Sequence, residues 1–172
     1  DQEPAIIDVL KSVAKERSPA ESILEHSAVG DSAGNGFIER AVRTAEEMTR
    51  VLKIDLEKRM GEQLPVDSVA FSWLVVHAVD CWNKLSLGID GKTSFERCKG
   101  KRYGGKLLPF GSPVMYRVAG KVQGGEMTER WYEGVWLVQR FHTQEHLVGK
   151  LSEGEVIRTR CVKEMPSPIT LD

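Results

Sequence analysis

The stretch GDSAGNGFIERAV, residues 30–42, has two readings that imply different folds. Residues 30–34, Gly-Asp-Ser-Ala-Gly, satisfy the G-x-S-x-G pattern of serine hydrolases, in which Ser32 occupies a sharp turn between a strand and a helix. In the second reading the glycines form a mobile loop, and the residue that matters is Glu39 in the helix that follows. The choice between them decides whether a hydroxyl or a carboxylate is the candidate reactive group.

The surroundings of Ser32 disfavour the hydrolase. A nucleophile elbow needs several parallel strands before it, and too little chain precedes Ser32 to form them. The pattern also arises easily in any glycine-rich segment. We therefore expect a flexible loop over residues 30–36, followed by a helix.

The composition is that of a globular protein with an uneven distribution of charge. The chain has 172 residues, of which 41% are hydrophobic and 28% charged, and a formal net charge of −1, which argues against a uniformly basic nucleic-acid binder. Between Lys92 and Lys121, however, eight basic residues accompany only one acidic residue, Glu96, for a local charge of about +7. The eight are Lys92, Arg97, Lys99, Lys101, Arg102, Lys106, Arg117 and Lys121.

Cysteine usage and the termini suggest an intracellular fragment. Cys81, Cys98 and Cys161 are far apart and form no C-x-x-C pair, so neither a disulfide framework nor a zinc ribbon is indicated. No apolar run approaches the length of a membrane span. The sequence opens with Asp-Gln-Glu-Pro rather than Met, which suggests a piece of a longer protein.

Helical periodicity predicts three helices in the first half. Residues 4–16 place apolar side chains at helical spacing. A helix of about six turns begins at Phe37 and is closed by Gly61 and Pro65. Residues 67–85 form a helix so apolar that it must pack on two sides or form half of an interface.

Beyond Leu87 the pattern changes to short strands. Alternation over residues 114–118, and the segments 130–141 and 155–165, are strand candidates. Four or five short strands in this region suggest a small barrel. A further short strand is possible at residues 21–29.

His142, Glu145 and His146 match H-x-x-E-H, the inverted zinc-protease pattern. That motif needs a helix to place both imidazoles on one face, whereas here it lies between strand-like segments. We interpret it as polar residues near a β-turn.

The spacing of Asp1 and Glu39 carries a resemblance. Thirty-seven residues separate them, and Asn35-Gly36-Phe37-Ile38-Glu39 opens the long helix. This resembles the second Asp and the final Glu of the Asp-Asp-Glu triad of retroviral-type integrases. SFERCKGKRY, residues 94–103, and PFGSPVMYRV, residues 109–118, look like the tail of copia-type retrotransposon polyproteins.

The resemblance covers residues 1–165 and implies an α+β fold. It predicts the C-terminal helical part of a truncated RNase H-like integrase core over residues 1–88 and a basic linker over 89–106. An SH3-like β-barrel over 107–165 and a tail over 166–172 follow. The core's central strands would then be missing, so the first 88 residues would be helices whose sheet is absent.

The resemblance also implies two-metal strand transfer of element DNA into target DNA, with magnesium or manganese as cofactor. Asp1 and Glu39 would be the catalytic metal ligands. The implied DNA-contacting residues are Asn35, Arg40, Arg43, Lys99, Lys101 and Arg102. The implied partners are element ends and target DNA in the nucleus, and other copies of the parent integrase, with no membrane.

Other interpretations remain open. The family needs a further Asp upstream, so this chain alone is expected to be inactive. Glu39 and Arg43 also have the i, i+4 spacing of an ordinary surface ion pair, and the basic segment also fits a solvated linker. The alternative function is a non-catalytic nucleic-acid or protein binding module of a retroelement polyprotein.

Overall fold

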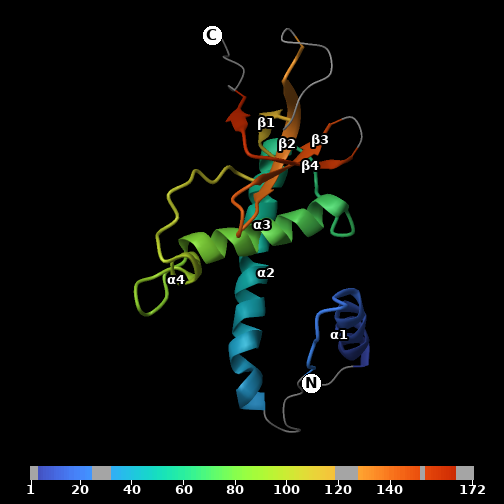
Figure 1. Ribbon diagram of the computed structural model, residues 1–172, viewed down its shortest axis with the longest axis vertical. Helices are drawn as coiled ribbons and strands as arrows, with labels where there is room; N and C mark the ends of the chain where they lie inside the picture. Colours follow the sequence, from blue (N-terminus) through green and yellow to red (C-terminus); the bar gives the residue numbers. More distant parts are fainter. Residues whose placement is uncertain (1–3, 25–31, 119–127, 152–153, 166–172) are drawn as a thin grey trace. The chain divides into compact units, whose positions relative to one another are not determined.

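The computed structural model describes residues 4–24, 32–118, 128–151 and 154–165, except for the side chains of residues 32–35. The chain divides into two compact units, residues 1–44 and 45–172, each of which is described by itself. Helices come first and an antiparallel sheet follows, which confirms the predicted α+β class (Figure 1). The predicted domain boundaries at residues 88, 106 and 165 stay a prediction.

The first unit contains α1 (Pro4–Glu16) and the start of α2 (Ser32–Met60). The helix predicted for residues 4–16 is confirmed. None of its residues is buried, and Ile6, Leu10 and Val13 are all exposed by two fifths or more. The apolar stripe of α1 therefore has no buried core of its own.

The predicted loop over residues 30–36 is wrong from Ser32 onward, because α2 already begins there. Each residue added to an existing helix gains a hydrogen bond, and this offsets the roughly 1 kcal/mol that a glycine costs within it. Residues 21–24 form no strand, and the rest of the candidate strand at 21–29 lies outside the described residues. At its other end α2 stops where predicted, before Gly61, whose φ is +74°.

The second unit continues α2 and adds α3 (Val69–Leu85) and α4 (Ser94–Lys99). Both added helices carry hydroxyl N-caps. The Ser68 hydroxyl accepts a hydrogen bond from the Phe71 amide at 3.2 Å, and the Thr93 hydroxyl accepts one from the Glu96 amide at 3.0 Å. The helix predicted over residues 67–85 is thus confirmed to within two residues.

Within the part of the chain that the structure describes, five strands form one antiparallel sheet. They are β1 (Pro113–Arg117), β2 (Trp131–Gln139), β3 (His146–Lys150), β4 (Val156–Thr159) and β5 (Val162–Glu164), in the order β4-β3-β2-β1-β5. The strand candidates at residues 114–118 and 130–141 are confirmed. Segment 155–165 is two strands rather than one, and β3 was not among the predicted segments.

The expected closed barrel is wrong, because β4 and β5 are the two edges of the sheet and no ladder joins them within the described residues. The chain passes from β4 to β5 over only residues 160–161. β4 pairs with β3 and β5 pairs with β1, so each uses one of its two hydrogen-bonding edges, and among the described residues the other edge is unpaired. The sheet therefore stays open.

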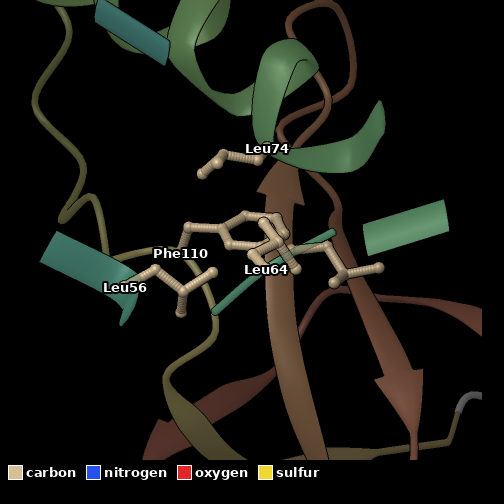
Figure 2. Packing of buried hydrophobic residues seen from close by; sticks show 5 residues of the cluster. Leu56, Leu64, Leu74 and Phe110 are labelled. Atoms are coloured by element: carbon tan, nitrogen blue, oxygen red, sulfur yellow. The ribbon is translucent and has the colours of Figure 1, made fainter. Parts of the chain in front are cut away.

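Two hydrophobic clusters hold the second unit together. In the first, Phe110 lies among Leu56 of α2, Leu64 of the connecting loop and Leu74 of α3, as Figure 2 shows. The second consists of Leu108, Val114, Tyr116, Trp136 and Val148, around the sheet. α3 packs on β2, so the apolar face of this helix is covered by the C-terminal sheet, and the expected absence of the central strands of an RNase H-like core stays a prediction.

Leu74→Ala should lower the free energy of unfolding of the second unit by about 2–5 kcal/mol, because it leaves a cavity where the side chain is fully buried. Leu85→Ala is the matched control, since Leu85 ends the same helix and is 62% exposed. Urea denaturation of both variants measures the difference. Equal effects would show that α3 is not packed as described.

Candidate nucleic-acid interface

Glu39 lies on an exposed turn of α2, with Arg40 and Arg43 exposed beside it. Glu39 and Arg43 form no ion pair despite their i, i+4 spacing, and Glu39 has no hydrogen-bond partner among the described residues. The interpretation of Glu39 as half of a surface ion pair is therefore not realised. Its carboxylate is open to a ligand.

The other predicted residues of this site are not placed. Asp1 lies outside the described residues, and Asn35 belongs to α2 by its backbone while its side chain is outside the description. The convergence of Asp1 with Glu39 stays a prediction.

The described residues do not by themselves assemble a magnesium site. Among them, no group of three or more His, Cys, Asp or Glu side chains is placed to hold a metal ion. Magnesium takes several oxygen ligands, most of them carboxylates and waters. Among the described residues, Glu39 would therefore supply only one ligand of the expected site.

The H-x-x-E-H segment forms a turn and a strand start, as expected from its flanks. His142 is exposed in the turn, whereas His146 begins β3, and its Nδ1 accepts a hydrogen bond from Trp136 Nε1 at 3.0 Å. Ser32, the other alternative, is the first residue of α2, and the segment before it is outside the described residues. Neither motif gains support as a catalytic site.

The predicted cations Lys99, Lys101 and Arg102 lie at the C-terminal end of α4, around the left-handed cap at Gly100. Lys99 Nζ donates to the His142 carbonyl at 3.3 Å, and Lys101 is exposed without a described partner. Arg102 Nε lies 3.6 Å from Glu96, with its side chain 81% exposed. Lys101 and Arg102 therefore remain open to phosphates, whereas Lys99 is half-buried and its ammonium also lies 5.7 Å from the centroid of the Phe141 ring.

Other cations of the basic segment are neutralised within the chain. Arg97 forms a two-pronged pair with Asp90, at 2.6 and 3.0 Å. Hydrogen bonds from Arg97 hold the pKa of Asp90 well below its usual range. Lys106 pairs with Glu164 at 2.6 Å. The local charge available to a partner is therefore smaller than the sequence count suggests.

The aromatic residues interleaved with these cations serve packing. Phe95 is buried and makes edge-to-face contacts with Tyr103 and Phe141, with ring centroids 5.4 and 5.3 Å apart. A buried ring has no face left for stacking on a base. Any nucleic-acid contact here is to the phosphate backbone.

A buried polar network behind this segment was missed. Lys84 of α3 is 2% exposed, and its ammonium lies 2.7 Å from Asp80 and 3.3 Å from the Gln139 side chain of β2. It also lies 4.8 Å from the centroid of the Tyr103 ring, whose hydroxyl donates to Gln139 at 2.7 Å. The network joins α3, β2 and the basic segment.

The sequence carried a signal for this network. Asp80 and Lys84 are one helical turn apart in an otherwise apolar helix, which predicts an internal ion pair. Burial raises the pKa of Asp80, and the hydrogen bond from Lys84 opposes that shift.

His77, one turn before Cys81 in α3, is also buried. Its Nε2 lies 3.3 Å from Cys81 Sγ, and its Nδ1 has no hydrogen-bond partner. Burial, then the charges of Lys84 and Arg59, lowers the pKa of His77 to about 4, and burial raises the pKa of the Cys81 thiol to about 11. Both groups are neutral at pH 7, so Cys81 is not the thiolate that a nucleophile requires, and the buried imidazole of His77 is only a weak base.

Lys84→Met should destabilise the second unit by about 3–5 kcal/mol, because it leaves the Asp80 carboxylate buried without its charge partner. The double variant Lys84→Met with Asp80→Leu should lose much less, since no buried charge remains. Denaturant titration measures both, with Lys58→Met on the exposed face of α2 as control. Additive effects of the two single changes would contradict the coupling.

Acidification should destabilise the second unit. The pKa of His77 is about 4 in the folded state against an ordinary 6.5. Between these two values His77 is protonated in the unfolded chain and neutral in the folded chain, so acid favours unfolding. Stability is therefore full above pH 6.5 and falls by about 2 kcal/mol between pH 7 and pH 5 from this group. His146, whose pKa burial also lowers, acts in the same direction.

Urea denaturation at pH 7 and pH 5 measures this loss, and His77→Gln should show a loss about 2 kcal/mol smaller. The same loss in wild type and variant would remove His77 as its source.

Within the described residues, no helix is both long and apolar enough to cross a membrane. Comparison of the sequence with models of protein families and with curated proteins finds no match. The assignment of a function therefore depends on the residues themselves and on the resemblance that they carry.

Proposed function

We propose that this chain is part of a copia-type retrotransposon integrase, which inserts element DNA into target DNA by phosphoryl transfer. The observation that carries the proposal is the Glu39 carboxylate, exposed and without a partner on α2, beside the exposed Arg40 and Arg43. Exposed i, i+4 ion pairs on helices are weak, and Glu46 and Arg50 of the same helix have this spacing and are also unpaired within the described part of the chain. The free carboxylate of Glu39 allows metal binding, and the resemblance of the motif around it selects this Glu as the metal ligand.

The sheet supports the second part of the proposal, an SH3-like module. Strands β1 to β4 follow one another as neighbours, and β5 returns to the free side of β1. This strand order is compatible with an SH3-like chain path in which the sheet stays open. The module carries the cations Lys99, Lys101 and Arg102 on the segment that leads into it.

In the proposed reaction, two magnesium or manganese ions held by Asp1, Glu39 and an upstream Asp would activate the attacking oxygen and stabilise the leaving one. Asn35, Arg40 and Arg43 would orient the DNA end next to these carboxylates. Lys99, Lys101 and Arg102 would neutralise phosphates without reading sequence. Because the upstream Asp is not in this chain, the chain alone should bind DNA without joining it.

A non-catalytic binding module is the second candidate. It is favoured by the contrast between the free cations after α4 and the absence of a metal-holding group among the described side chains. The two functions differ in one measurable respect, since only the integrase requires Glu39. A binding module would tolerate any polar residue there.

Glu39→Gln, in a protein that joins this chain to upstream sequence with the further Asp, should lower strand transfer at least about 100-fold. A metal-bound carboxylate contributes several kcal/mol to such a reaction. Glu46→Gln is the control, because Glu46 is an exposed Glu two turns further along α2. Joining of labelled element-end DNA to a plasmid measures both.

DNA binding measured in parallel separates lost chemistry from lost affinity. Full strand transfer by Glu39→Gln would remove Glu39 from the site and leave the binding module as the function.

A further inference from the structure

Three arginines from distant parts of the sequence line one pocket at the edge of the sheet. Arg117 ends β1, Arg158 lies in β4, and Arg160 lies in the corner between β4 and β5. The pocket has a volume of about 340 Å³. Its lining is completed by Val118, Glu145, Thr159 and Cys161.

A buried threonine fixes the floor of this pocket. The Thr159 hydroxyl donates to the Arg117 carbonyl at 2.6 Å and accepts a hydrogen bond from the Cys161 amide at 3.1 Å. The Arg117 amide donates to the Cys161 carbonyl at 3.1 Å. The backbones that carry the three arginines are thus bound to one another, so the arginines converge on a preorganised surface.

Glu145 is the one carboxylate in the lining, and its contacts with the arginines are long. Its oxygens lie 3.5 Å from Arg160 Nε and 3.8 Å from Arg158 Nη1. The Glu145 side chain is 14% exposed, whereas those of Arg158 and Arg160 are 60% and 85% exposed. At these distances the guanidinium donors are largely unused.

Glu145 is held in place and ionised. The Thr143 hydroxyl donates to it at 3.0 Å, and this hydrogen bond, with the nearby arginines, holds the pKa of Glu145 below its usual range. One carboxylate against three guanidinium groups leaves two net positive charges in the pocket. The lining therefore has unused charge and unused donors for a further anion.

We propose that this arginine pocket binds the phosphodiester backbone of DNA, and that the Glu145 carboxylate partly neutralises the arginines in the free chain and so opposes the binding of DNA. Guanidinium groups bind phosphate oxygens through paired hydrogen bonds, a geometry that a lysine cannot supply. The choice of DNA as the source of the phosphate rests on the proposed function. The pocket itself rests on residues outside the predicted DNA-binding set.

The test measures binding of the 172-residue chain to a short labelled DNA duplex, by fluorescence anisotropy between about 50 and 200 mM salt. Arg158→Gln with Arg160→Gln should weaken binding and reduce the slope of log affinity against log salt by about 1 for each arginine. Lys11→Gln with Lys15→Gln removes the same charge from the exposed surface of α1 and should change the slope much less.

Glu145→Gln should act in the opposite direction. Without the opposing charge, DNA should bind several-fold more tightly and with a steeper salt dependence. Unchanged affinity in Glu145→Gln would overturn the role of Glu145, and equal losses in the two double variants would overturn the pocket. Circular dichroism of each variant confirms that the surface changes leave the fold intact.

The phosphate that the pocket binds could belong to the DNA backbone or be a free anion. Adding inorganic phosphate to the DNA complex, with chloride at equal ionic strength as the control, distinguishes these two ligands. Weak competition at millimolar phosphate supports the DNA backbone as ligand. Tight phosphate binding that the arginine changes abolish, with DNA affinity unaltered, would overturn it. Because no strand transfer is measured, the pocket can stand if the Glu39 experiment fails, and the Glu39 experiment can succeed if the pocket fails.

Discussion

The buried ammonium of Lys84 is the constraint on which the packing of the second unit depends. A charge removed from water must be compensated by partners with good geometry, and Lys84 finds them on three separate elements. Asp80 belongs to its own helix, Gln139 to β2, and Tyr103 to the segment that follows α4. Loss of the Asp80 partner would cost several kcal/mol, and moving Gln139 or Tyr103 away would cost about 1–2 kcal/mol each. The positions of the helix, the sheet and the basic segment are thereby coupled.

Local patterns in the sequence predicted the elements, and long-range pairing decided their arrangement. The helical stripe over residues 67–85 and the alternation over 114–118 are properties of a few consecutive residues, and both predictions are confirmed. The start of α2 was misplaced because glycine content was read as a loop, although a helix under way can include it. The predicted barrel was wrong because β4 and β5 do not pair with each other, and no local pattern shows which strands become the edges of a sheet.

The candidate sites, too, were predictable where they depend on local sequence and not where they depend on long-range contacts. The charged face of α2 predicted that Glu39 would be exposed, and it is, but periodicity along one helix says nothing about whether Asp1 lies near it. The count of basic residues between Lys92 and Lys121 predicted a phosphate-binding segment, yet a count does not show which cations pair with acids of the same chain, as Arg97 does with Asp90. The arginine pocket had no sequence signal at all, because Arg117 and Arg158 meet only through the corner that Thr159 fixes.

The use of each cation follows from its distance to a carboxylate. Lys84, Arg97 and Lys106 lie 2.6–2.7 Å from an acidic oxygen, so their charges are already paired within the chain, and of these pairs that of Lys84 is buried. Arg102, Arg158 and Arg160 lie 3.5–3.8 Å from one, too far for strong hydrogen bonds, and their side chains are at least 60% exposed. The formal net charge of −1 averages over both kinds. A net charge near zero therefore does not argue against a phosphate-binding surface. The acidic residues are neutralised by the cations at contact distance, and the exposed arginines remain available for a ligand.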